Sequence, residues 1–256
     1  MIRHLRPFVR IIFFGVLMTS LSIVVPLVRI FSGSKIAFSI HRQGMLLMHK
    51  ILGIRLNVIG ELPNKPALIM CNHPSYFDIF FNIGKHPAVM VVGHQFKKWP
   101  FVGWLGIALN TIWVNRNNSG ARKKARKDIS QTIEKGLCVF ICPEGRTAGS
   151  HYIQEVKPAL FHDACEKRIP IVFYSFWYHS SEFPYFHDLK SGFLIHLFHH
   201  LWRALQNEFV VVDMKVSAPR NIESAKKGMN DFYRFNRWHL RNSKDLKNIV
   251  NTNIAL

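Results

Sequence analysis

The chain has 256 residues, 48% of them hydrophobic, and its 34 Lys and Arg against 15 Asp and Glu give a formal net charge of +19. This length suits one sizeable core and excludes two independent ones, so we expect a single domain with an added membrane element. So strong a positive charge implies an anionic partner, either nucleic acid or an anionic membrane surface. The apolar N-terminus favours the membrane, and we expect no nucleic-acid partner.

The first segment is an apolar run from Ile11 to Val28 that follows several arginines. A membrane-spanning helix needs about 20 apolar residues, so a true span, an in-plane or re-entrant anchor and a signal peptide all stay open. The next segment, Lys35 to Leu52, mixes apolar and basic residues, which is typical of a helix in the headgroup region or packed on the core. We assign residues 1–54 to an N-terminal membrane-associated helical element and residues 55–256 to the main domain.

The main domain alternates short β-rich runs with helical stretches. This alternation predicts an α/β fold, a single domain with a central mixed β-sheet flanked by helices. The expected strands are Leu56–Ile59, Ala67–Cys71, Ala88–Val92, Thr111–Val114, Leu137–Cys142, Ile169–Ser175 and Glu208–Val216. The expected helices are Tyr76–Gly84, Phe101–Leu109, Ser119–Gly136, Pro158–Lys167, Ser191–Leu205 and a basic tail from Asn221.

Cysteines and histidines do not form metal-binding patterns in this sequence. No C-x-x-C spacing links the four cysteines, so we expect reduced, mostly buried thiols at Cys71, Cys138, Cys142 and Cys165. No H-E-x-x-H or comparable spacing links the later histidines His179, His187, His196, His199 and His200. We therefore expect no metal.

The most informative segment is Asn72-His73-Pro74, at the end of the second expected strand. A residue before proline avoids helical geometry and proline suits a first helical turn, so His73 should lie at the mouth of a helix, at the strand edge where α/β proteins bind ligands. Asp78 could then reach His73 from the first turns of that helix. A carboxylate on one imidazole nitrogen leaves the other to take a proton from an alcohol, which points to acyl transfer without a serine nucleophile. The alternative is a helix cap in which Asp78 only favours the positive helix end.

Four blocks resemble the motifs of the glycerolipid acyltransferase family, which includes the 1-acylglycerol-3-phosphate acyltransferases. Asn72 to Asp78 is similar to its N-H-x4-D motif, and Gly106 to Arg116 to its second block. Phe140 to Thr147 resembles F-P-E-G-T-R, with Cys142 before the proline and with Arg-Thr in place of Thr-Arg. Ile169 to Val172 resembles the fourth, V-P-I-V-like block. The resemblance covers residues 56 to 216.

The resemblance implies that 1-acyl-glycerol-3-phosphate is the acceptor and that its sn-2 hydroxyl is acylated to give phosphatidic acid. Acyl-CoA or acyl carrier protein would be the donor, with no further cofactor. The site residues it implies are His73 as base and Asp78 as its orienting partner, Pro170 for donor positioning, and, for the acceptor, Arg116, Glu144, Gly145, Arg146 and Thr147. Independently of the family, glycine allows close backbone approach and arginine offers a bidentate fork for phosphate.

Two alternatives remain at this stage. The first is the same chemistry on another lysolipid acceptor, a lysophospholipid or a lyso-amino-acid lipid. The second is a non-catalytic basic module that binds membrane or nucleic acid. The basic run Arg122 to Lys127 would suit CoA phosphates, an acidic carrier protein, lipid headgroups or simply solvent. Reduced thiols and a thioester donor predict a membrane-associated protein at the cytoplasmic face of the inner membrane.

Overall fold

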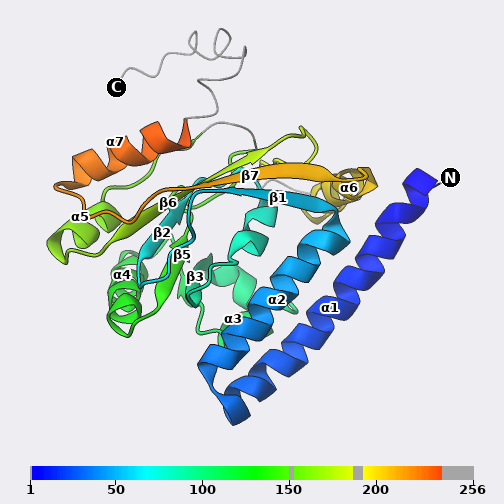
Figure 1. Cartoon of the computed structure of the whole chain (residues 1–256), viewed down its shortest axis with the longest axis horizontal. Helices are drawn as coiled ribbons and strands as arrows, with labels where there is room; N and C mark the ends of the chain where they lie inside the picture. The colour runs from blue at the N-terminus through cyan, green and yellow to red at the C-terminus, as the bar shows by residue number, and fades with distance from the viewer. Residues whose placement is uncertain (1, 150–152, 187–192, 238–256) are drawn as a thin grey trace, which may run out of the picture.

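The fold is a seven-stranded mixed β-sheet with helices on both faces, in a computed structural model that describes residues 2–149, 153–186 and 193–237 (Figure 1). The strand order is β1-β7-β6-β2-β5-β3-β4. All neighbours pair in parallel except β6 and β7, so β1 and β7 run opposite to the other five strands. The expected α/β class with a central mixed sheet is therefore confirmed.

Each expected strand is present, with shifted ends. The strands are β1 (Ile54–Ile59), β2 (Leu68–Cys71), β3 (Ala88–Gly93), β4 (Ile112–Val114), β5 (Cys138–Ile141), β6 (Ile171–Tyr178) and β7 (Val210–Val216). The central strands are covered on both faces: every residue of β2 is buried, and so is nearly all of β6. The sequences of such strands are continuous apolar runs and do not alternate between apolar and polar residues, which is typical of parallel strands covered by helices on both faces.

The helices differ more from expectation than the strands. They are α1 (Ile2–Ser32), α2 (Ser34–Leu52), η1 (Tyr76–Phe81), η2 (His94–Lys98), α3 (Val102–Ala108), α4 (Ser119–Glu134), α5 (Ala159–Glu166), α6 (Phe193–Gln206) and α7 (Ala225–Asn236). The helix expected up to Gly84 is a shorter 3-10 helix, η1. The expected helix start at Ser191 and the tail beyond residue 237 lie outside the described residues.

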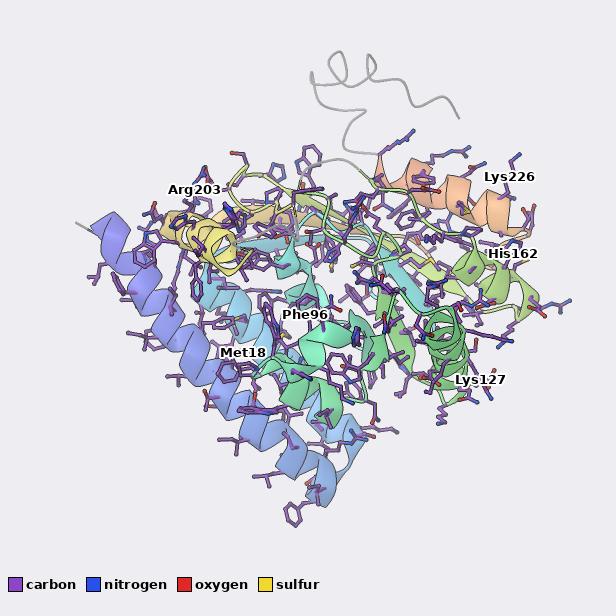
Figure 2. The ribbon with its side chains drawn as sticks, turned by 180° about the vertical axis from the view of Figure 1, so that it is seen from behind. Met18, Phe96, Lys127, His162, Arg203 and Lys226 are labelled. Carbon is purple, nitrogen blue, oxygen red and sulfur yellow. The ribbon has the colours of Figure 1, made fainter. Side chains whose placement is uncertain are left out.

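The N-terminal helices form an antiparallel pair beside the β1 end of the sheet (Figure 1). Residues Leu5–Ser32 of α1 are long and apolar enough to cross a membrane by length and composition. One side of α1 packs on the body, since Met18, Leu21 and Val25 are buried. Figure 2 shows side chains along the outer side of α1. Most of the remaining apolar side chains of the helix are exposed, including Phe8, Ile12, Phe13, Val16, Ile23, Leu27, Ile30 and Phe31. The division at residue 54 stays a prediction, because α2 also packs on β1 and η1.

Arginines fix both ends of α1 to the main domain. Near its start, Arg10 donates hydrogen bonds to the carbonyls of Leu205, Asn207 and Glu208 at 2.9, 2.6 and 2.6 Å. Near its end, Arg29 donates to the carbonyls that close α3 and to Oδ1 of Asn110 at 2.8 Å. The helix is therefore held along the body and does not project from it.

We predict that Arg10→Ala lowers the free energy of unfolding by about 2–3 kcal/mol, because a charged donor to three carbonyls is lost. The measurement is urea denaturation of the detergent-solubilised protein. Lys50→Ala is the control, since the exposed Lys50 side chain has no hydrogen-bond or ion-pair partner among the described residues. Equal unfolding midpoints for the two variants would contradict the role of Arg10.

Candidate active site

Three parallel strands end at one edge of the sheet, and each leads into a residue singled out by the sequence. Strand β2 leads to His73, β5 to Glu144 and β4 to Arg116. This is the carboxyl edge, where open α/β sheets bind their ligands. The structure thus brings together residues that are far apart in the sequence.

His73 and Asp78 form the centre of this edge. Nδ1 of His73 donates to Oδ2 of Asp78 at 2.8 Å. The Asp78 side chain is fully buried, whereas 18% of the His73 side chain is exposed, so the imidazole is accessible from outside. The prediction that Pro74 lies in the first turn of the helix is wrong, because Ser75 is the N-cap of η1 and Pro74 precedes it. The backbone N–H of Ser75 donates to Asp78 Oδ2 at 3.0 Å. Asp78 therefore both caps the helix and binds His73.

The second oxygen of Asp78 has a partner that the sequence reading missed. The hydroxyl of Tyr178 donates to Asp78 Oδ1 at 2.6 Å. Tyr178 lies at the end of β6, beyond the expected strand end at Ser175, and only recognition of the longer strand could have signalled it. Burial raises the pKa of Asp78 above its ordinary value, and the hydrogen bonds from His73, Tyr178 and Ser75 act in the opposite direction.

The backbone of His73 is fixed by two further side chains. Glu144 Oε1 accepts the His73 backbone N–H at 2.8 Å, and its other oxygen accepts the backbone N–H of Gln154 at 2.8 Å. Burial raises the pKa of Glu144 to about 7. The side-chain amide of Asn72 pairs with both backbone groups of Phe176, at 2.7 and 3.0 Å, and so extends the pairing of β2 with β6. Both carboxylate oxygens of Glu144 are thus occupied within the loop.

Arg116 lies against the glycine of the third block. Gly145 has a φ of +76°, which favours glycine, and a Cβ built there would lie 3.6 Å from Nε of Arg116. The side chain of Arg122 donates to the Arg116 carbonyl at 2.6 Å, which fixes the backbone of Arg116. Arg116 has no ion-pair partner among the described residues. Its charge is therefore available to a ligand at this edge.

The inverted Arg-Thr pair places the two side chains differently from each other. Arg146 is exposed, and its Nε donates to the side-chain oxygen of Gln154. Thr147 is buried, and its Oγ1 has no hydrogen-bond partner among the residues that the structure describes.

Pro170 is not part of the assembled site. It precedes β6 at the amino edge of the sheet, where its carbonyl accepts the N–H of Leu68 at 2.9 Å. His73 follows the opposite end of β2, the strand that pairs in parallel with β6. About six residues of extended chain, or roughly 20 Å, therefore separate Pro170 from His73 along the strand direction. A direct contact of Pro170 with groups at His73 has no geometric basis here.

Cys142 is the thiol nearest the centre. Its Sγ lies 2.8 Å from Sγ of Cys71, and Cys142 is also close enough to His73 for each group to shift the pKa of the other. Burial alone would raise the pKa of Cys142, but the Cys71 thiol and His73 outweigh it and lower the pKa to about 6. All four cysteines are free, as expected. Within the described residues, no group of three or more His, Cys, Asp or Glu is arranged to hold a metal ion.

The pKa of His73 reflects the same neighbours. Burial acting alone lowers it, but the Cys142 thiol and the Asp78 carboxylate together raise it above the ordinary value for histidine. The site is thus a buried carboxylate and a thiol around an accessible imidazole, beside an unpaired guanidinium. Such a group can hold or release a proton at the imidazole and can bind an anion next to it.

Comparison with known proteins supports this description of the site over slightly less than half of the chain. Residues 54–177 match the Acyltransferase family model. A 1-acyl-sn-glycerol-3-phosphate acyltransferase of Neisseria gonorrhoeae is 30% identical over 117 residues, 45% of this chain and 46% of that protein. A lyso-ornithine lipid O-acyltransferase of Rhizobium meliloti is 31% identical over 122 residues, 47% of this chain and 40% of that protein. The match thus spans less than half the length of these relatives.

One solved structure shares the whole fold. The 1-acyl-sn-glycerophosphate acyltransferase of Thermotoga maritima superposes with a TM-score of 0.66 over 99% of this chain and 100% of its own, at 16% sequence identity. Identity this low shows the fold alone. The matched segment covers β1 to β5 and all of β6 except Tyr178, so the strands that lead to His73, Arg116 and Glu144 lie within the part of the chain that is similar to the acyltransferase family.

Proposed function

We propose that this protein transfers a fatty acyl group from a thioester to the sn-2 hydroxyl of 1-acyl-glycerol-3-phosphate, giving phosphatidic acid. The observation that carries the proposal is an accessible imidazole, bonded through Nδ1 to a buried carboxylate, at the same strand edge as the unpaired Arg116. A basic binding module would have no use for a buried His–Asp–Tyr chain of hydrogen bonds, because burying such groups costs free energy.

In the proposed reaction, His73 takes the proton of the acceptor hydroxyl through Nε2. The oxygen attacks the thioester carbonyl, the carbon–sulfur bond breaks, and the imidazolium returns the proton to the leaving thiolate. Asp78 holds the tautomer with Nδ1–H and stabilises the imidazolium, and Tyr178 fixes Asp78 in turn. Glu144 acts through the His73 backbone, so it is a positioning residue in this scheme.

The charges favour a phosphate acceptor over a lyso-amino-acid lipid. Arg116 forms no ion pair within the described part of the chain, and Arg146, which follows the Gly145 that Arg116 lies against, is exposed. The carboxylates of Asp78 and Glu144 are already bonded within the protein, so neither is free to bind an ammonium group. The lyso-ornithine lipid acyltransferases among the relatives keep that acceptor class as the second candidate.

We further propose that the protein lies on the membrane with α1 in the interfacial plane. Arg10 and Arg29 hold both ends of α1 along the body, and Trp104, Ile107 and Phe198 add exposed apolar side chains on α3 and α6, both of which contact α1. Removal of α1 as a signal peptide would strip buried side chains from the core.

With α1 in the interfacial plane, a lipid acceptor reaches the site without passing through water. Acyl-CoA or acyl carrier protein would supply the donor from the cytoplasmic side.

The decisive experiment measures acyl transfer in vesicles with wild type and His73→Ala, across lysophosphatidic acid, lysophosphatidylcholine and lyso-ornithine lipid. We expect transfer to lysophosphatidic acid and a loss of about 10²–10⁴-fold in His73→Ala. His179→Ala is the matched control, because His179 forms a 2.8 Å pair with Asp213 and takes no part in the hydrogen bonds that link His73, Asp78 and Tyr178. Transfer only to lyso-ornithine lipid would replace the acceptor, and full activity in His73→Ala would refute the mechanism.

Asp78→Asn tests the origin of the His73 pKa. The base must be neutral, so the wild-type rate should rise with pH through the raised His73 pKa. Removing the Asp78 charge lowers the pKa of His73, so the rate of Asp78→Asn should reach its plateau at a lower pH than the wild-type rate. The plateau rate itself should be about 10²–10⁴-fold smaller than in wild type. The measurement is kcat/KM against pH. Tyr178→Phe keeps the Asp78 carboxylate, so its kcat/KM profile must not move to lower pH. An identical shift in Asp78→Asn and Tyr178→Phe would disprove the Asp78 charge as a cause of the raised His73 pKa.

Cys142 should be labelled by iodoacetamide in step with a loss of acyl transfer. Its pKa of about 6 makes it a thiolate at pH 7, whereas burial raises the pKa of Cys138 to about 11. Mass spectrometry and activity are followed together at pH 7, because a group added at Cys142 would block His73. Cys165→Ala should lose activity at the same rate as wild type. Survival of activity after complete Cys142 labelling would contradict the prediction.

A further inference from the structure

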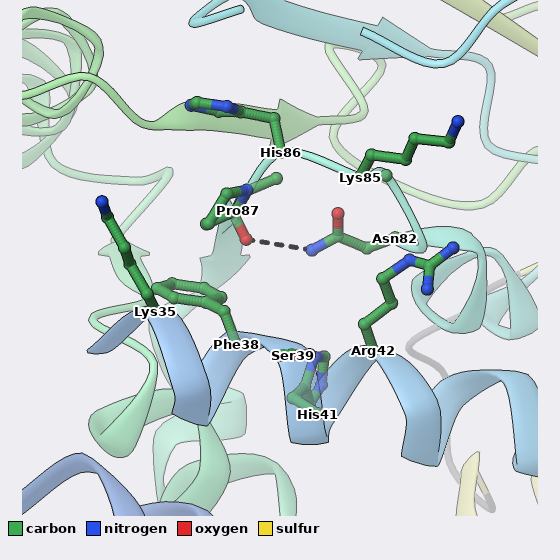
Figure 3. A pocket seen from close by; sticks show the side chains of 11 residues that line it. Lys35, Phe38, Ser39, His41, Arg42, Asn82, Lys85, His86 and Pro87 are labelled. Atoms are coloured by element: carbon green, nitrogen blue, oxygen red, sulfur yellow. Dashed lines mark hydrogen bonds between the residues drawn. The ribbon is translucent and has the colours of Figure 1, made fainter. Parts of the chain in front are cut away.

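A basic pocket lies between α2 and the segment that precedes β3 (Figure 3). Its cavity is about 280 Å³. Lys35 and Arg42 enter it from α2, and Lys85 and His86 line it from the facing segment. The pocket has no part in the acyl transfer proposed above.

The lining carries positive charge without any compensating carboxylate. Neither Asp nor Glu lines the pocket, and Lys35, Arg42 and Lys85 form no ion pair within the described residues. Arg42 uses only its Nε, which donates to the Ile83 carbonyl at 2.8 Å. Burial lowers the pKa of His41 to about 4, so that ring is neutral and the charge comes from the other three side chains.

The start of α2 adds to this positive field. The helix begins at Ser34, has no side-chain cap and has no acidic residue in its first turn. The positive end of its dipole is therefore uncompensated where Lys35 enters the pocket. A helix terminus and three unpaired cations together favour a ligand with a phosphate group.

The pocket is distinct from the proposed active site. It lies at the amino edge of the sheet, since Ala88 opens β3 and Nε2 of His86 donates to the carbonyl of Gly136, just before β5, at 2.7 Å. His73 follows the carboxyl edge of the same parallel strands. One phosphate cannot contact both places.

We propose that this pocket binds the phosphate-bearing headgroup of an anionic phospholipid, separately from the acceptor. The turn between α1 and α2 supports a lipid, because Ile30, Phe31 and Ile36 are 74%, 82% and 50% exposed directly beside Lys35 in the chain. Acyl chains would contact this apolar turn while the phosphate enters the pocket. The proposal rests on the lipid-facing orientation of α1, but its binding test requires no membrane.

The experiment is calorimetric titration of the full chain in detergent with dihexanoyl phosphatidic acid. We expect two sites in wild type, one at the acceptor site and one at the pocket. Lys35→Ala/Lys85→Ala should weaken one site roughly thirtyfold, given the usual gain from each basic residue at an anionic lipid. Ser39→Trp should remove the same site at unchanged charge, because Ser39 lies exposed on the pocket rim.

Two controls separate the pocket from the overall charge and from the acceptor site. Lys123→Ala/Lys127→Ala removes equal charge on exposed α4 positions and should keep both sites. Arg116→Ala should weaken only the other site. Two unchanged sites in Lys35→Ala/Lys85→Ala would overturn the proposal, and so would inorganic phosphate binding at the pocket as tightly as the lipid. Loss of acyl transfer to every acceptor would refute the proposed function and leave the pocket titration unaffected.

Discussion

The arrangement of the site depends on one buried carboxylate. Asp78 is fully buried, and a buried charge is tolerated only where hydrogen bonds replace water. Its three donors come from three places: the ring of His73 after β2, the backbone of Ser75 at the start of η1, and the hydroxyl of Tyr178 at the end of β6. Satisfying Asp78 therefore fixes the helix start, the imidazole orientation and the pairing of two strands at the same time.

The sequence was informative wherever one local rule decided the structure. Apolar runs between helical stretches predicted the seven strands, and the proline after His73 predicted that His73 lies outside the helix. Tyr178 was missed because its strand continues past Ser175 under tertiary pairing with β7, which local patterns do not encode. The expected strand Ile169–Ser175 already placed Pro170 at the amino end of β6, whereas His73 follows the carboxyl end of β2. The part of Pro170 in positioning the donor stays a prediction.

The departures from the family motif make physical sense together. In the inverted pair, Thr147 takes the buried position and Arg146 the exposed one, where it bonds to Gln154. Arg116 is the guanidinium that lies against Gly145, and it forms no ion pair with any Asp or Glu among the described residues. Cys142, in place of an aromatic ring, introduces a thiol that shifts the pKa of His73 upward. One consequence is a smaller fraction of neutral base at a given pH than the carboxylate alone would produce.

The excess of positive charge is best understood through its position relative to the apolar surface. Arg10 and Arg29 direct their charges inward to backbone carbonyls, so they bind α1 to the body instead of adding to the surface field. Among the cations without an ion pair in the described part of the chain, Arg116 lies at the carboxyl edge of the sheet, and Lys35 and Lys85 lie at its amino edge. Two separated cationic sites next to an apolar helix suit a protein that holds one anionic lipid while it works on another, because each phosphate can then be bound without displacing the other.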